Sequence, residues 1–127
     1  MTMPHERTRS LRWGSEVLQE IFDDDLVDIS ERTRAAELLR NFPTAAALSN
    51  WIQSDVSCIP AEAALAIEGA GELLRVILRS SNCFAKLKHS VLFTLRHYPD
   101  SGSTERWTSP GRDRTIREWL LPEDWYD

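Results

Sequence analysis

Few residues of this chain have both the type and the spacing that catalysis or metal binding requires. His89 and His97 are eight positions apart on one expected helix, whereas a pair of metal ligands on a helix usually stands four positions apart. Cys58 and Cys83 form no CxxC pair. Cys83 falls at the expected start of a helix, which favours a thiolate, yet a lone cysteine at such a turn is usually a small core residue. We therefore expect a protein that is not an enzyme, with no catalytic residue, no metal site and no cofactor.

Two further patterns resemble ligand sites only superficially. Asp23, Asp24 and Asp25 are adjacent, but the spaced ligands, central glycine and terminal glutamate of an EF-hand loop are missing around them. Gly69 and Gly71 lie inside a helical pattern, and no GxxxxGK[ST] motif accompanies them. We interpret the aspartates as the solvated end of a helix or as carboxylates that are offered to a partner.

Arginines supply the alternative functional surface. The sequence ERTR occurs at residues 6–9 and again at 31–34, and each copy pairs a glutamate with an arginine three positions later. Such a pair stabilises a helix by about 0.2–0.5 kcal/mol. The same arginines could instead form a basic strip that binds nucleic acid, although interspersed glutamates weaken this interpretation. The strip consists of Arg7, Arg9, Arg12, Arg32 and Arg34.

The C-terminal tail gathers aromatic and acidic side chains. Large aromatic residues with charged neighbours are typical of the hot spots of protein interfaces. For Trp107 and Trp119 we favour the alternative, packing against the helices, whereas Trp125 and Tyr126 are assigned to a partner or a dimer contact. The full candidate set for partner binding joins the tail to the aspartate triplet: Asp23, Asp24, Asp25, Trp119, Glu123, Asp124, Trp125 and Tyr126.

Helices must position all of these residues. Apolar positions recur at steps of three and four, and no two-residue alternation indicates a strand. Pro43 and Pro99 end two of the expected helices, because the residue before a proline is pushed out of the helical region. Thr44 caps another. The helices are expected at residues 4–22, 31–42, 45–53, 60–78 and 83–97, with a last short helix at 115–121.

A shift of 56 residues aligns the two halves of the chain without gaps. We interpret residues 3–53 and 59–109 as two similar helical hairpins that bury their apolar faces on each other, although two amphipathic hairpins can also match by composition alone. The two long helices are then expected to cross near Gly14 and Ala70. The identical pairs include Pro4/Pro60, Glu6/Glu62, Leu18/Leu74, Ile21/Ile77, Leu39/Leu95, Arg40/Arg96, Pro43/Pro99 and Trp51/Trp107.

The expected fold is therefore a single all-α domain over residues 1–127. It is a bundle of two pseudo-repeated hairpins with a C-terminal arm at 110–127, and the arm holds a helix and the aromatic-acidic tail. The opening MTMPHERTRS, followed by a helix and the segment LLRNFP, resembles a family of short uncharacterised bacterial proteins that begin MTMPxERTRA. The resemblance covers about the first 45 residues, and Trp13 and Gly14 depart from it. It implies no known activity.

Composition limits the classes of function. The 127 residues are 42% hydrophobic and 28% charged, which is typical of a globular domain. A net charge of −5 argues mildly against an unassisted nucleic-acid-binding protein. No apolar run approaches the length of a membrane span, and the polar N-terminus lacks the apolar core of a signal peptide. We therefore expect no membrane association and a cytoplasmic location.

These observations predict a small acidic protein-binding module. Its partner would be another protein or a second copy of the chain. One concrete form is an inhibitor carried by a phage or mobile element, which presents acidic side chains to a basic groove of a host nucleic-acid-handling complex such as a CRISPR effector. The alternative is a helical nucleic-acid-binding or transcription-regulating domain that uses the arginine strip.

Overall fold

The computed structural model describes residues 3–54, 56, 58–79, 83–100, 104, 106–108 and 119–120. Over these residues the chain forms an all-α bundle without strands, as the sequence predicts. Of the expected helix at 115–121, the described part holds only Trp119 and Leu120, which are not helical. The five helices are α1 (Pro4–Asp23), α2 (Ile29–Leu39), α3 (Ala45–Ser54), α4 (Ala61–Arg79) and α5 (Ala85–Leu95).

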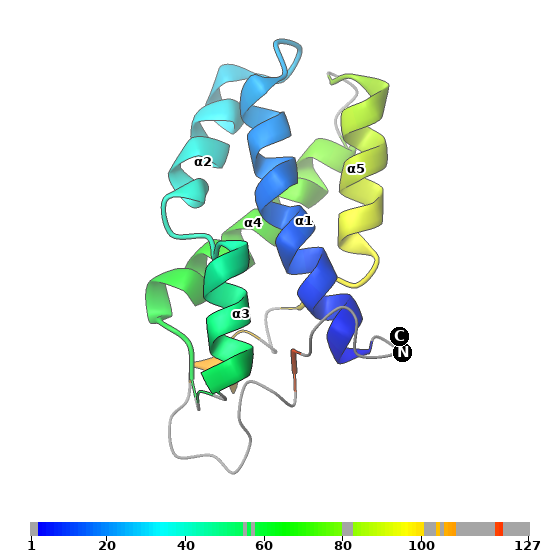
Figure 1. Ribbon diagram of the computed structural model, residues 1–127. Coiled ribbons are helices and arrows are strands. Elements are labelled where there is room, and N and C mark those ends of the chain that lie inside the picture. The colour runs from blue at the N-terminus through cyan, green and yellow to red at the C-terminus, as the bar shows by residue number, and fades with distance from the viewer. Residues whose placement is uncertain are drawn as a thin grey trace.

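Four of the helices form the body of the bundle (Figure 1). Helix α1 packs most extensively on α2 and α5, and α4 packs on the same two helices from the other side. In Figure 1, α4 slants behind α1, and α3 lies below α2. Each long helix is therefore held between the two shorter helices α2 and α5.

Helix α1 shows why the sequence folds in this way. Pro4 occupies its first turn, where the missing N–H of proline is no loss. The carboxylate of Glu6 accepts a hydrogen bond of 2.9 Å from the N–H of Met3, which closes the start of the helix. Leu11, Leu18 and Ile21, spaced by seven and three positions, are fully buried on one face. The apolar spacing thus selects the face that joins the core.

The helix bounds repeat along the chain. Helices α2 and α5 both begin and end 56 positions apart, at Ile29 and Ala85 and at Leu39 and Leu95. Helices α1 and α4 also end 56 positions apart. Their buried residues coincide under the same shift in the pairs Leu11/Ile67, Leu18/Leu74 and Ile21/Ile77.

An aromatic ring lies beside small residues of both long helices. A methyl group added to Gly14 would lie 3.5 Å from Tyr98 Cε1, and one added to Gly71 would lie 3.0 Å from Tyr98 Cε2. Because these atoms are on opposite edges of the ring, Tyr98 lies between the two glycines. Its hydroxyl donates a hydrogen bond of 2.6 Å to the carbonyl of Ile67, and burial raises the pKa of the phenol. Gly14 on α1 and Gly71 on α4 therefore leave room for a side chain that follows α5.

The described residues beyond α5 pack back on the bundle. Trp107 and Leu120 are fully buried, as we expect for Trp107 from its correspondence with Trp51. The N–H of Ile59 donates a hydrogen bond of 2.9 Å to the carbonyl of Trp107, which joins this segment to the start of α4. Among the described residues, none of the helices has the length and apolar character needed to cross a membrane.

Candidate functional site

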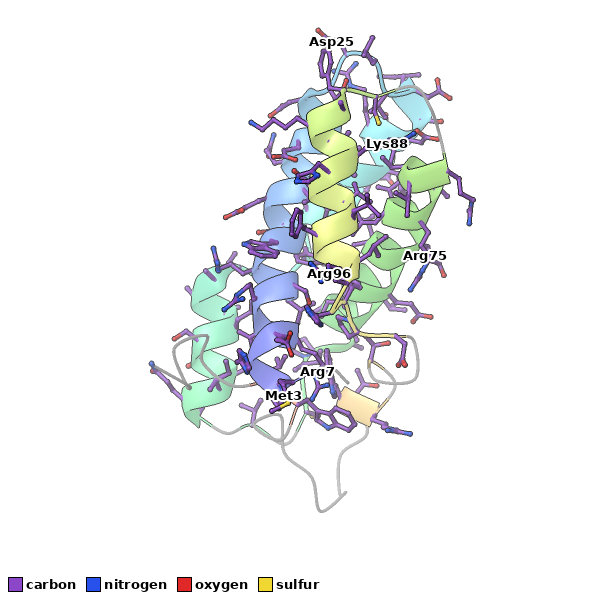
Figure 2. The ribbon with its side chains drawn as sticks, turned by 90° about the vertical axis from the view of Figure 1, so that its right-hand side faces the viewer. Met3, Arg7, Asp25, Arg75, Lys88 and Arg96 are labelled. Carbon is purple, nitrogen blue, oxygen red and sulfur yellow. The ribbon has the colours of Figure 1, made fainter. Side chains whose placement is uncertain are left out.

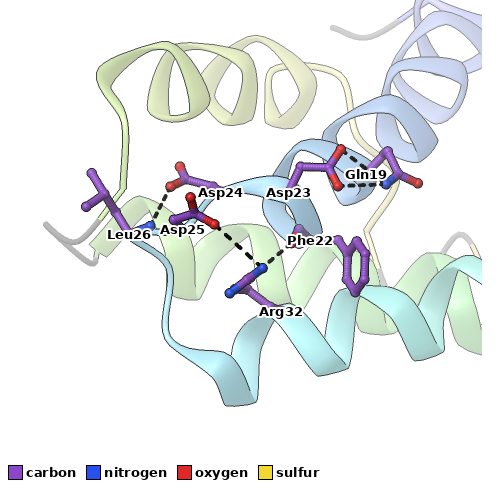
Figure 3. A network of polar contacts seen from close by, with 7 residues as sticks. All are labelled: Gln19, Phe22, Asp23, Asp24, Asp25, Leu26 and Arg32. Carbon is purple, nitrogen blue, oxygen red and sulfur yellow. Dashed lines mark hydrogen bonds and ion pairs between the residues drawn. The ribbon is translucent and has the colours of Figure 1, made fainter.

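The aspartate triplet ends α1 and begins the α1–α2 connection, and its three carboxylates differ in environment (Figure 3). Asp24 is buried, with 4% of its surface exposed. One of its oxygens accepts a hydrogen bond of 2.9 Å from the N–H of Leu26, and the other accepts one of 3.0 Å from the N–H of Phe84. Since Phe84 is the N-cap residue of α5, Asp24 ties the α1–α2 connection to the start of α5.

Asp23 and Asp25 remain on the surface. Asp23 accepts hydrogen bonds of 3.2 Å from the side-chain amide of Gln19. Asp25 is 3.9 Å from the guanidinium of Arg32, whose Nε donates to the carbonyl of Phe22. Figure 2 shows Asp25 at one end of the bundle, far from Met3 and Arg7 at the other. Of the predicted triplet, two carboxylates are therefore exposed at this end and one is structural.

Large apolar side chains are exposed around these carboxylates. Phe22, Leu26, Ile29 and Phe84 are exposed by 41%, 52%, 67% and 54%. Of the apolar residues Leu26, Val27 and Ile29, only Val27 enters the core. The N–H of Leu26 donates a hydrogen bond to Asp24 within this turn. We call this surface the acidic end, and it consists of Phe22, Asp23, Asp25, Leu26, Asp28, Ile29 and Phe84.

The five arginines of the predicted strip contact different neighbours. The Nε of Arg7 donates a hydrogen bond of 2.9 Å to the carbonyl of Trp119. Arg32 contacts the α1–α2 connection, and Arg34 lies beside Gly69 of α4. The remaining two, Arg9 and Arg12, lie beside Trp13 and Glu16 on α1. Each of these guanidinium groups therefore has its own neighbours within the chain.

Trp119, a predicted partner-binding residue, is half-buried between two arginines. The guanidinium carbons of Arg7 and Arg106 lie 5.5 Å and 5.6 Å from the centre of its ring, and the ring of Trp107 lies 6.3 Å away. Burial lowers the pKa of Arg7. Trp119 thus takes the packing role that we favoured. The other predicted tail residues, Glu123, Asp124, Trp125 and Tyr126, lie outside the described residues.

The histidines and cysteines do not assemble into a catalytic group. His97 Nε2 is 2.9 Å from a carboxylate oxygen of Glu6, which joins the end of α5 to the start of α1. The hydrogen bond from Met3 N–H, aided by His97, lowers the pKa of Glu6. Burial raises the pKa of the Cys83 thiol, which is the opposite of the effect expected from a helix start. Within the described ranges, no three His, Cys, Asp or Glu residues are placed to hold a metal ion.

Two grooves run between helices, and neither was predicted. The groove between α1 and α5 has a volume of about 330 Å³ and is lined by Trp13, Glu16, Val17, Glu20, His89, Ser90, Phe93 and Thr94. Trp13 and Phe93 also line an adjoining cavity of about 160 Å³, together with Glu6, Arg9, Ser10, Arg96 and His97. These two aromatic side chains therefore separate the α1–α5 groove from its neighbour.

The second groove, between α2 and α4, is larger and has a volume of about 460 Å³. Glutamates line it, together with one arginine and an exposed leucine: Arg34, Leu38, Asn41, Glu62, Leu65, Ala66, Glu68, Gly69 and Glu72. Comparisons with protein-family models, with curated proteins and with solved structures found no match for this chain. The geometry of these surfaces is therefore the basis for assigning a function.

Proposed function

We propose that the protein is a small acidic protein-binding module without enzymatic activity, and that the acidic end is its contact surface. The observation that carries the proposal is the exposure of four large apolar side chains next to the carboxylates of Asp23, Asp25 and Asp28. Apolar side chains that gather on a surface and are rimmed by polar groups mark interaction sites in soluble proteins. Isolated exposed leucines would need no such explanation.

The charge of the chain indicates the chemistry of the partner. The net charge of −5 and the carboxylates of the acidic end favour a basic partner surface with an apolar centre. A concrete form is an inhibitor, from a phage or a mobile element, that covers the basic groove of a host nucleic-acid-handling complex such as a CRISPR effector. Small size, acidity and an exposed apolar patch support this form. A second copy of the chain is the competing partner.

A pair of matched variants tests the contact surface. Leu26 and Leu92 are exposed to nearly the same extent, 52% and 51%, but only Leu26 belongs to the acidic end. The full chain and its Leu26→Ser and Leu92→Ser variants would each be immobilised and exposed to a bacterial lysate, and captured proteins would be quantified by mass spectrometry. We expect one stoichiometric partner that Leu26→Ser loses and Leu92→Ser keeps. Equal capture by all three baits, or no partner at all, contradicts the proposal.

The homodimer is tested separately. Sedimentation equilibrium of the full chain would give its mass in solution. A dimer that Leu26→Ser dissociates and Leu92→Ser does not would assign the acidic end to a second copy instead of a foreign partner.

We also propose that the fold is a duplicated helical hairpin. The shared offset of α2 and α5 and the coincident buried residues of α1 and α4 support it. In a duplication the equivalent core positions should carry similar energies, so substitutions at Trp51 and Trp107 are its most direct test.

A further inference from the structure

The α1–α5 groove combines aromatic walls with acidic groups. Trp13 and Phe93 form one wall, and the carboxylates of Glu16 and Glu20 come from successive turns of α1. His89 meets the ring of Phe93 edge to face at 4.7 Å. Aromatic faces and carboxylates in one groove attract cations, because the negative ring face and the carboxylate charge act on the same group.

The opposite side of the aromatic wall shows how these rings are used within the chain. There the guanidinium carbon of Arg9 lies 5.9 Å from the centre of the Trp13 ring, and that of Arg96 lies 5.9 Å from the centre of the Phe93 ring. Both arginines line the adjoining cavity. On the groove side, by contrast, no arginine or lysine belongs to the lining. The wall therefore carries cations on one side and faces carboxylates on the other.

The α2–α4 groove provides a second comparison. A shift of 56 positions carries Glu72 onto Glu16 and Arg34 onto Ser90. The α2–α4 groove therefore contains its own guanidinium, whereas the equivalent position in the α1–α5 groove holds a short hydroxyl side chain. Glu16 and Glu72 are equivalent carboxylates of the two grooves, whereas Glu20 corresponds to Val76, which does not line the α2–α4 groove. A guanidinium belongs to the lining of the α2–α4 groove alone.

Glu20 supplies an independent observation. One of its carboxylate oxygens is buried and accepts no hydrogen bond from any described residue. A buried carboxylate oxygen without a donor is unfavourable, and rotation of the Glu20 side chain toward the groove would let a cationic donor there satisfy it. Glu20 also lies one turn before Asp23, so the groove opens next to the acidic end.

We propose that the α1–α5 groove binds an arginine side chain of the partner protein, with the guanidinium stacked on Trp13 or Phe93 and bonded to Glu20. This inference rests on the proposed protein-binding function and names the group that the partner inserts. Arginine fits better than lysine, because its planar guanidinium stacks on aromatic faces and can bond a carboxylate through two N–H groups. Glu16 adds charge at the exposed rim.

A peptide titration of the isotope-labelled full chain tests the proposal without a partner. The probe is acetyl-Gly-Arg-Gly-amide, and the control peptide carries citrulline, which has the shape of arginine without its charge. We expect the arginine peptide to shift the amide resonances of Glu16, Glu20 and Phe93 and the indole resonance of Trp13, with a dissociation constant of about 1 mM. The citrulline peptide should leave these resonances unchanged.

Variants sharpen the titration. Glu20→Gln should weaken peptide binding at least about fivefold, since it removes the charge and keeps the shape. If Glu20→Gln impairs folding, Glu16→Gln replaces it in the titration, because Glu16 is at an exposed position, and it should also weaken peptide binding. Glu72→Gln is the matched control, because it changes the equivalent carboxylate of the other groove, and binding should be unaffected.

Two results would overturn the proposal. One is equal binding of the arginine and citrulline peptides, and the other is the absence of shifts in the groove at about 10 mM peptide, tenfold above the expected dissociation constant. If either result is obtained while Leu26→Ser still abolishes capture of a partner, the arginine site is contradicted and the protein-binding function is retained. If the arginine peptide binds in the groove but no partner protein is captured and no dimer forms, the protein-binding function alone is contradicted.

Discussion

The α1–α5 groove and the α2–α4 groove lie at equivalent positions in the two halves, because a shift of 56 carries every lining residue of the second except Glu68 onto the first or its adjoining cavity. The two grooves differ most at one equivalent position, which holds Trp13 in the first and Gly69 in the second. The indole divides the first space in two, whereas the glycine leaves the second undivided. The two grooves thus present different surfaces, although positions 56 residues apart line them.

The largest expected effect tests whether the two cores are equivalent. Trp51→Ala and Trp107→Ala should each lower the free energy of unfolding by about 3–5 kcal/mol, because each removes a buried indole. Urea denaturation followed by circular dichroism would measure both. If one substitution lowered the free energy of unfolding strongly and the other left it unchanged, the two halves would not have equivalent cores.

The next effect concerns the small residues at the centre of the bundle. A methyl group added to Gly14 would lie 2.7 Å from Cζ of the buried Phe42 ring, which has little room to move. We expect Gly14→Ala, and Ala70→Leu at the equivalent position, to destabilise the protein by about 1–3 kcal/mol through overpacking. Chemical denaturation would measure both, and unchanged stability would show that the rings can shift.

A smaller effect separates the two equivalent aromatic residues, Phe42 and Tyr98. Tyr98→Phe removes the hydrogen bond to the Ile67 carbonyl and should cost about 0.5–1.5 kcal/mol. Phe42→Tyr is the reciprocal change, which adds a hydroxyl and is expected to gain nothing. If Tyr98→Phe left the midpoint of denaturation unchanged, the hydroxyl would have no net role in stability.

A pH-dependent effect distinguishes Glu6 from its counterpart Glu62. The pKa of Glu6 is lowered in the folded protein, so its carboxylate stabilises the fold above the pKa of the unfolded state. This stabilisation is lost as the pH falls through the lowered folded pKa. Glu6→Gln should therefore lower the melting temperature at pH 7, with a difference from wild type that shrinks in acid. Glu62→Gln is the control, and an equal loss at all pH values would contradict the assignment.

The smallest effect is expected at Gly69. A methyl group there would approach the ends of the Leu38 and Arg34 side chains at 2.8 Å and 3.1 Å, where a terminal methyl and a long flexible side chain can shift more easily than an aromatic ring. The gain in helix propensity, about 1 kcal/mol, should offset this crowding and leave Gly69→Ala close to wild type. Thermal denaturation of the Gly69→Ala and Gly14→Ala variants would compare their stabilities. Equal destabilisation by the two substitutions would contradict this prediction.

The periodicity of the sequence predicted the helices well, because burial of one apolar face dominates their formation. Helix α1 ends one residue from its predicted end, whereas α2 and α5 end at Leu39 and Leu95, before the predicted ends at 42 and 97. The burial of Trp107 was also predicted, from its correspondence with Trp51.

The surfaces were harder to predict, because they depend on contacts between distant parts of the chain. Nothing local distinguishes Asp24, whose partner Phe84 is 60 positions away, from the aspartates beside it. The wall of Trp13 and Phe93 needs α1 and α5 to pack side by side, which periodicity alone does not specify. The charge of Asp23 and Asp25 was the only sequence signal for the acidic end, and the exposure of Leu26 and Ile29 ran against the apolar pattern.

The two hydrogen bonds of Asp24 also bear on the entropy of binding. They hold the α1–α2 connection and the start of α5 in one arrangement, with Leu26 and Phe84 already displayed. A loop that is ordered on folding has little conformational freedom left to lose when a partner arrives. Asp24 would therefore influence affinity without touching the partner, by keeping the contact surface organised in its absence.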